Sequence, residues 1–181
     1  MRLEADRGRI RRVMEAFGQA ASGSVRVYLV GGTTAVLLGW RATTVDVDFV
    51  MRPEDEEILR ALPALKEALQ VNLEIASPAD FIPVPAGWED RGRFEAQIGP
   101  VAFYHFDLYA QALAKVERGH PRDLEDVREM TRRGLVEPRR ALEYFARVEP
   151  QLHRFPAIHA PSFRRAVEEA FGGRPYGSAQ Q

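Results

Sequence analysis

Apolar side chains recur every three to four positions along two early stretches of the chain, and this spacing predicts amphipathic helices. The first covers residues 1–21, with an inner side formed by Ile10, Val13, Met14 and Phe17. The second covers residues 54–70, with an inner side formed by Ile58, Leu59, Leu62, Leu65 and Leu69. Pro63 interrupts the second stretch. Because proline removes a backbone donor, we expect it to kink or split that helix.

Shorter apolar runs between and after these helices predict β-strands. They cover residues 25–30, 45–50 and 71–75, followed by a hairpin of 94–98 and 101–106 that turns at Gly99-Pro100. Successive side chains of an extended strand point to opposite faces. We therefore expect Val45, Val47 and Phe49 to face one way. Asp46 and Asp48 should then face the other.

The second half of the chain has the pattern of helices. Asp107 can cap a helix that ends at Gly119, and Pro121 suits the first turn of another that closes at Gly134. Residues 138–171 are also mainly helical in pattern. The predicted class is α+β, a mixed β-sheet core flanked by helices with a helical C-terminal part. We expect a core over 1–134, a helical extension over 135–171 and a disordered tail over 172–181.

Composition narrows the chemistry. The 181 residues carry a net charge of −1 and include no cysteine, which excludes disulfides, thiolate catalysis and cysteine-ligated metal centres. No apolar run is long enough to cross a membrane, and the amino terminus lacks a signal-peptide core. We therefore expect a cytoplasmic protein with no membrane partner. The four histidines lack zinc-site spacing, so each is expected at the surface or at a helix cap: His105, His120, His153 and His159.

Asp46 and Asp48 are the main candidates for chemistry. Two like charges on one face of a strand repel, and each raises the pKa of the other unless a positive charge lies nearby. A divalent cation supplies that charge, because Mg²⁺ takes one or two carboxylates and completes its shell with water and substrate phosphates. The alternative is a half-buried strand whose wet face happens to be acidic.

A double glycine, Gly31-Gly32, ends the apolar run 25–30 and precedes Thr33 and Thr34 at the start of a short predicted helix. Glycine lets the backbone approach a ligand closely, and the first N–H groups of a helix attract phosphate. The pattern is neither a P-loop nor the dinucleotide-binding G-x-G-x-x-G motif. The alternative is a tight turn that needs a positive φ.

Together these residues resemble the DNA polymerase β-like nucleotidyltransferase superfamily, and within it the minimal AbiEii-type branch of bacterial toxin–antitoxin systems. The resemblance covers about residues 25–133 and is carried by Gly31-Gly32-Thr33, Arg41, Thr43, Asp46-Val47-Asp48, Lys115, Arg118, Arg122-Asp123 and Asp126. It implies transfer of an NMP from an NTP to a hydroxyl acceptor, with Mg²⁺ or Mn²⁺. The implied acceptor is a tRNA end or a protein, and the implied role is a toxin paired with an antitoxin.

Such enzymes carry a third carboxylate on a following strand, and Glu74 is the candidate here, in place of the more common aspartate. Alternation puts Asn72 and Glu74 on one face, with Val71, Leu73 and Ile75 on the other. Asp80 is the fallback, although it lies beyond Pro78 in a predicted loop. The expected catalytic and metal-binding residues are thus Asp46, Asp48 and Glu74.

Lys115 is one of only two lysines among the 25 basic residues, which suggests a place that requires a compact ammonium group. By the resemblance it binds the triphosphate, and a nearby aspartate positions it. The alternative is an ion-pair set in which Lys115 and Arg118 on one helix meet Asp123 and Asp126 on the next. The expected nucleotide-binding residues are Gly31, Gly32, Thr33, Thr34, Arg41, Thr43, Lys115, Arg118 and Asp123.

Two further hypotheses come from other classes of protein. A non-catalytic nucleotide- or protein-binding module would keep the fold, and the glutamate at the third carboxylate position is its main support. A metal-dependent phosphohydrolase needs only the aspartate pair and leaves the double glycine and Lys115 without roles. In the long loop over 81–93, Trp88 either stacks on a base or closes the core.

Overall fold

A mixed five-stranded sheet forms the centre of the computed structural model, which describes residues 3–173. The strands lie in the order β5 (Asn72–Ile75), β4 (Asp46–Arg52), β2 (Val25–Val30), β7 (Val101–His105) and β6 (Arg93–Ile98). β2 pairs antiparallel with β4 and parallel with β7. β5 is parallel to β4, and β6 forms the predicted hairpin with β7. The predicted α+β class is confirmed.

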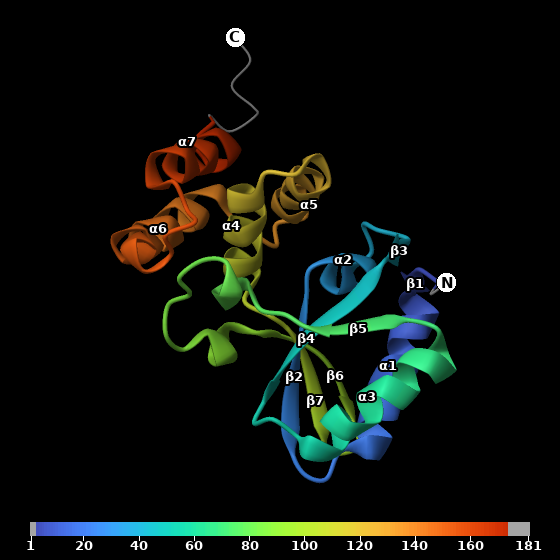
Figure 1. Cartoon of the computed structure of the whole chain (residues 1–181). Helices are drawn as coiled ribbons and strands as arrows, with labels where there is room; N and C mark the ends of the chain where they lie inside the picture. The colour runs from blue at the N-terminus through green and yellow to red at the C-terminus, as the bar shows by residue number, and fades with distance from the viewer. Residues whose placement is uncertain (1–2, 174–181) are drawn as a thin grey trace.

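Two helices, α1 (Arg7–Ala20) and α3 (Glu56–Leu69), lie side by side along one face of the sheet (Figure 1). The predicted inner side of α1 is buried as expected. Of the two outcomes predicted for Pro63, the split is not found, since α3 is one helix with Pro63 inside it. Pro63 is exposed, while leucines on either side of it pack against the apolar cluster under the sheet, so packing keeps the helix continuous.

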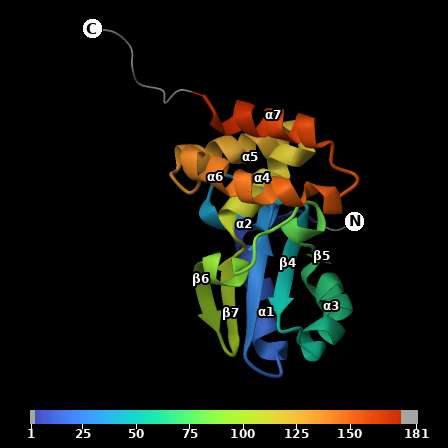
Figure 2. The ribbon, with the colours of Figure 1, turned by 90° about the vertical axis from the view of Figure 1, so that its left-hand side faces the viewer.

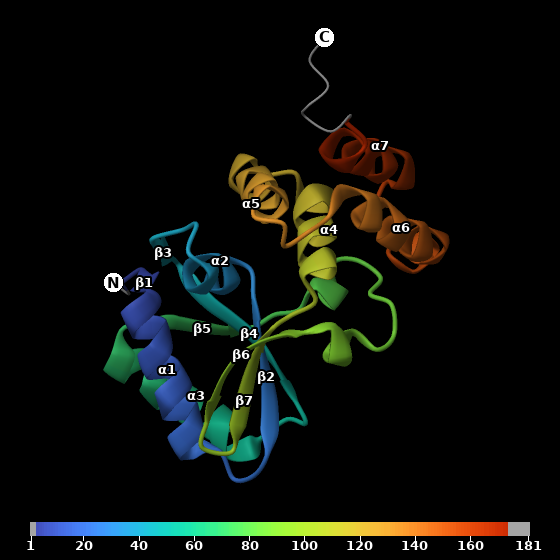
Figure 3. The same ribbon diagram turned by 180° about the vertical axis from the view of Figure 1, so that it is seen from behind.

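The second half of the chain forms a helical layer beyond one end of the sheet, and the views from the side and from behind show it best (Figures 2 and 3). It contains α4 (Leu108–Arg118), α5 (Pro121–Arg132), α6 (Pro138–Val148), the 3-10 helix η3 (Glu149–Arg154) and α7 (Ala160–Phe171). These helices share one apolar cluster with Tyr28 and Val30 of β2. The helical C-terminal part is therefore confirmed. The expected tail lies, from residue 174 on, outside the described residues.

A short helix, α2 (Gly32–Leu38), connects the end of β2 to a small two-stranded sheet of β1 (Ala5–Asp6) and β3 (Thr43–Thr44). Asp107 caps α4 as predicted by accepting from the amides of Tyr109 and Ala110. Gly119 ends that helix at φ +67°, a value that favours glycine. Among residues 3–173, no helix is long and apolar enough to span a membrane.

Several side chains lie in environments that strand alternation does not give. Val45 and Ile75 are more than half exposed, because β4 begins only after Val45 and Ile75 is the last residue of the edge strand β5.

Trp88 stacks on Phe106, with ring centroids 4.3 Å apart, so it closes the core.

The expectation for the histidines is wrong for His105, which is fully buried. Its ring lies between Thr34 Oγ1, at 3.1 Å from Nδ1, and Glu95 Oε2, at 2.9 Å from Nε2. Burial is possible there because both ring nitrogens have a partner. His159, in contrast, caps α7 as expected by accepting from the amide of Ser162.

The close approach of α1 to the β6–β7 turn generates a stability prediction. A Cβ on Gly18 would lie 2.7 Å from Ile98 Cγ2 and 2.8 Å from the Ile98 carbonyl oxygen. Because the backbone atom cannot move aside cheaply, Gly18→Ala should lower the melting temperature by several degrees, equivalent to about 1–3 kcal/mol. Gly23→Ala is the matched control, since nothing lies within 4 Å of its Cβ. Equal melting temperatures by calorimetry would contradict the packing.

Candidate functional site

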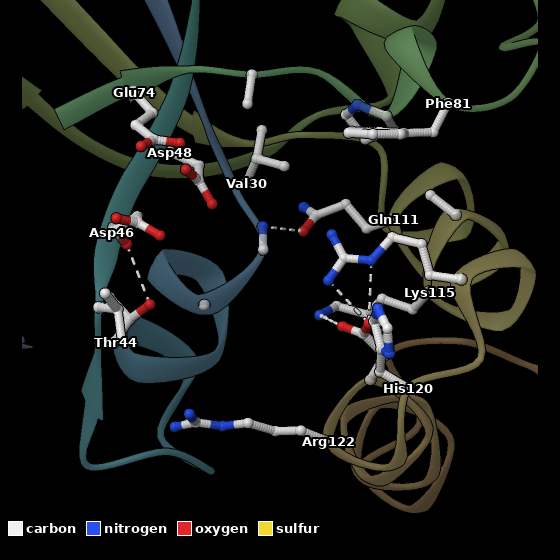
Figure 4. Close-up of a pocket in the computed structure, with 18 of the residues that line it drawn as sticks. Val30, Thr44, Asp46, Asp48, Glu74, Phe81, Gln111, Lys115, His120 and Arg122 are labelled. Carbon is white, nitrogen blue, oxygen red and sulfur yellow. Dashed lines mark hydrogen bonds and ion pairs between the residues drawn. The ribbon is translucent and has the colours of Figure 1, made fainter. Parts of the chain in front are cut away.

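A cavity of about 450 Å³ lies between the ends of β2, β4 and β5 and the helices α4 and α5 (Figure 4). Its size suits a small-molecule ligand. One wall carries three carboxylates, those of Asp46, Asp48 and Glu74. The facing wall carries Lys115, Arg118, His120 and Arg122. The structure thus places the predicted carboxylates and the predicted cations of α4 in one cavity with walls of opposite charge.

The register of the strands builds the acidic wall. Asp48 pairs with Val30 of β2 and with Glu74 of β5, so two predicted site residues meet on neighbouring strands. Asp46 is opposite Asn72, whose amide nitrogen donates to Asp46 Oδ1 at 2.7 Å and to Glu74 Oε1 at 2.6 Å. Asn72 therefore bridges two negative charges. Val47 and Phe49, between and after the aspartates, point into the core as predicted.

The pKa of Asp48 is raised to about 6, first by burial of its carboxyl group and then by the charges of Asp46 and Glu74. Arg118 and Lys115 oppose this rise without cancelling it. The acidic wall consequently has more negative charge than its protein surroundings neutralise. Asp80, the alternative third carboxylate, does not line the cavity, since it accepts from the amide of Ser77 in the cap of a short 3-10 helix.

Among residues 3–173, no group of three His, Asp or Glu side chains is arranged to hold a metal ion on protein ligands alone. The donor set still fits a hard cation such as Mg²⁺, which uses one or two carboxylates and completes its shell with water and phosphate oxygens. Asp46 and Asp48 are the two that would hold it. The excess negative charge around Asp48 supports this assignment.

The double glycine brings the backbone to the edge of the cavity. Gly31 has φ +62°, and a Cβ there would lie 3.2 Å from Asp48 Oδ2. A Cβ on Gly32 would lie 2.1 Å from Thr44 Oγ1, so no larger residue fits. The amide of Gly31 donates to Gln111 Oε1 at 2.9 Å, which ties this turn to α4. Both glycines line the cavity, and the tight-turn alternative is also met.

Three threonines predicted to bind nucleotide require correction as side-chain ligands. Thr33 and Thr34 are buried and do not line the cavity. Thr33 Oγ1 accepts from the amide of Asp48 at 3.1 Å, and Thr34 Oγ1 donates to the Leu29 carbonyl. Thr43 bonds to Glu4 outside the cavity, and its neighbour Thr44 lines it instead. The reason is that α2 turns the hydroxyls of Thr33 and Thr34 toward backbone groups, while β3 turns that of Thr43 toward the Glu4 carboxylate.

The cationic wall is held by an ion-pair cluster of Arg41, Lys115, Arg118, Asp123 and Asp126. Lys115 Nζ lies 2.6 Å from Asp126 Oδ2 and 3.2 Å from Asp123 Oδ1. Arg118 also contacts Asp123, and Arg41 contacts Asp126. The interhelix ion pairs considered as the alternative role of Lys115 therefore exist. With three cations and two carboxylates, the cluster keeps one net positive charge beside the cavity.

Sequence reasoning missed several residues of this cavity. Gln111 lies four positions before Lys115, so helical spacing alone would have placed both on one side of α4. His120 and Arg122 flank Pro121 at the start of α5 and line the cavity, and Arg122, which the resemblance included but did not assign to the site, extends the cationic wall. Phe81 lines the cavity from the 81–93 loop, where no pattern marked it.

Comparison with protein families gives one result. Residues 9–137 match the model of a family described as a nucleotidyltransferase of unknown function (DUF6036). The matched segment runs from α1 through α5 and contains the whole cavity. Searches of curated proteins and of solved structures gave no significant match.

The raised pKa of Asp48 predicts how stability depends on pH. Because this group binds its proton more tightly in the folded chain, stability falls as pH rises from about 4 through 6, by up to about 3 kcal/mol. Asp48→Asn removes the ionisation. With metal ions removed by a chelator, the melting temperature of the variant should lie several degrees above that of wild type at pH 8. At pH 4 the two melting temperatures should be equal. Glu15→Gln on the exposed side of α1 is the control. A variant that is less stable at pH 8 would show that Asp48 is structural.

The ion-pair cluster generates a second prediction. Asp126 is 2% exposed, and its carboxylate accepts hydrogen bonds from Arg41, Lys115 and the indole N–H of Trp40. Asp126→Ala leaves Arg41 without its carboxylate and Lys115 with Asp123 alone, so urea denaturation should show a loss of about 3–5 kcal/mol. Glu129→Gln, one turn later on α5, breaks only exposed ion pairs with Arg132 and Arg133 and should unfold close to wild type. If both variants unfold alike, the cluster does not hold the cavity wall.

Proposed function

This chain belongs to the nucleotidyltransferase family of unknown function that its residues 9–137 match, and we propose that it is a metal-dependent enzyme that moves an NMP from an NTP to a hydroxyl acceptor. The observation that carries this proposal is the division of charge across the cavity. Asp46, Asp48 and Glu74 face Lys115, Arg118 and Arg122. A divalent cation bound to a polyphosphate is the kind of ligand that complements both walls at once.

The chemistry assigns a task to each wall. A bound Mg²⁺ or Mn²⁺ supplies positive charge that offsets the charge developing on the phosphates. Asp46 and Asp48 hold this ion, and the backbone at Gly32 together with Arg118 and Arg122 orients the phosphates. The acceptor oxygen forms a bond to the α-phosphorus while the bond from that phosphorus to the oxygen bridging to the β-phosphate breaks. Pyrophosphate leaves, and the hydroxyl proton passes to Glu74.

The role of Lys115 follows from its partners. Asp123 and Asp126 hold its ammonium at the edge of the cavity, where it contributes charge from a fixed position. Arg118 is 45% exposed and can reach a ligand more freely. We therefore assign direct phosphate contact to Arg118 and Arg122, and electrostatic support to Lys115. Preorganised charge of this kind stabilises phosphoryl transfer without reorganising during the reaction.

The finer identity rests on the AbiEii-type resemblance alone. On that basis we propose a tRNA end or a protein side chain as acceptor, and a toxin role with an antitoxin partner. The charges and shape of the cavity do not distinguish among NTPs by base edge, because the groups that face it act on phosphate and metal.

A non-catalytic nucleotide-binding module is the second candidate, and one observation favours it. Glu74 is exposed and bonded to the amide of Asn72, which also holds Asp46. Two of the three proposed catalytic carboxylates thus already have a protein partner. Such a module would bind NTP and metal through the same walls and would transfer nothing.

Incubation with NTPs labelled at the α-phosphate, in Mg²⁺ or Mn²⁺ and with total tRNA or cell lysate, tests the proposal. We expect the α-phosphate label to appear in RNA or protein. With NTPs labelled at the γ-phosphate instead, the RNA and protein should stay unlabelled. Asp46→Asn and Asp48→Asn should lower transfer by at least about a hundredfold while the fold persists. Glu15→Gln should transfer at the wild-type rate.

The outcomes separate the two candidates. Nucleotide retained on a filter without labelled product would support the binding module and overturn the transferase. Transfer of the γ-phosphate label would indicate a kinase. Transfer that survives both aspartate variants would remove the acidic wall from the mechanism.

A further inference from the structure

Phe81 is an exposed aromatic ring in the cavity that also carries the charged groups of both walls. Its side chain is 44% exposed, and it is the only Phe, Tyr or Trp among the described residues that line the cavity. Figure 4 shows the ring projecting toward the cavity on the side away from Asp46. An exposed large apolar side chain at a ligand cavity calls for an explanation, since burying it would be favourable.

The backbone that carries Phe81 is held firmly. The 3-10 helix η1 (Pro78–Asp80) ends at Phe81, and the amides of Phe81 and Ile82 both donate to the Pro78 carbonyl at 3.0 Å. Ile82 is fully buried in the core beside it. The exposure of Phe81 is therefore not the result of a loosely held loop. A backbone that is held in place before the ligand arrives lowers the entropy lost on binding.

The surroundings of Phe81 differ from the rest of the cavity. Ala76, Pro78 and Ala114 line the cavity with it and carry no charge. Arg118 lies one helical turn beyond Ala114 on α4, at a rise of about 6 Å. The cavity thus offers an apolar, aromatic end and a cationic part about one turn away. A nucleotide has the same division, with a flat base at one end and phosphates at the other.

We propose that Phe81 is the platform on which the nucleobase of the NTP stacks, so that it is a binding residue that makes the cavity select nucleotides over bare polyphosphate. This inference rests on the proposed function. Stacking uses the face of a base, so purines, which have the larger rings, should bind more tightly than pyrimidines. Because every base has such a face, the platform should distinguish poorly among bases with rings of equal size. Trp88, the aromatic residue that the sequence suggested for this role, packs against Phe106 instead.

Binding of ATP and of inorganic tripolyphosphate, each with Mg²⁺, tests the proposal by calorimetry on the full chain. Wild type should bind ATP more tightly than tripolyphosphate. Phe81→Ala should weaken ATP binding about tenfold and leave tripolyphosphate binding unchanged, because only ATP has a base. Phe81→Trp, which keeps an aromatic ring, should bind ATP about as tightly as wild type. Phe94→Ala is the control, since Phe94 is an exposed aromatic residue on β6 that does not line the cavity.

Each remaining outcome has a definite meaning. Unchanged ATP affinity in Phe81→Ala would overturn the platform while leaving the proposed function standing. Equal weakening of ATP and tripolyphosphate would also overturn it, because the ring would then serve the shape of the cavity. If wild type binds tripolyphosphate as tightly as ATP, base stacking is absent. If it binds neither, the proposed function fails, and this inference fails with it.

Discussion

Asp126 ties three parts of the chain together at one buried carboxylate. It accepts from the guanidinium of Arg41 in the segment between α2 and β3, and from the ammonium of Lys115 on α4. The carboxylate itself belongs to α5, so the helical layer and the sheet layer are joined at this point. Removing two or more charges from water is costly unless each finds a partner, and here each does. The position of the cationic wall, and with it the width of the cavity, depends on this cluster.

The two walls of the cavity differ in how far protein groups neutralise their charge. The cationic wall neutralises most of its own charge through Asp123 and Asp126, so it is stable before any ligand binds. The acidic wall does not, and the pKa of Asp48 rises to about 6 because burial and neighbouring carboxylates leave its charge uncompensated. A site that is neutralised on one side and short of positive charge on the other is consistent with the cation that we propose enters with its ligand. This asymmetry supports the proposed binding of a metal ion with a nucleotide more than the location of any single residue does.

Local patterns in the sequence were sufficient for most of the main elements and for the aspartate pair of the acidic wall. Helical spacing located α1 and α3, residue type located the caps of α4, and two apolar runs around Gly99-Pro100 located the hairpin. Asp46 and Asp48 share a face in the structure because a strand has a fixed period of two. Local patterns failed at element ends and edges, where Val45 and Ile75 are exposed, and at Pro63, where packing outweighed a helix-breaking residue. They also failed for His105, whose partners Thr34 and Glu95 are distant along the chain.

The sequence by itself thus determined which residues could carry charge, metal or phosphate, because residue type and spacing are local properties. Only the tertiary structure decided which of them meet. It turned the hydroxyls of Thr33 and Thr34 into the protein, placed Glu74 opposite Asp48 and brought Phe81 to the cavity. It also gave Lys115 two carboxylate partners at once. Strand register, helix crossing and burial depend on contacts between segments far apart in the chain, and no local pattern encodes those distances.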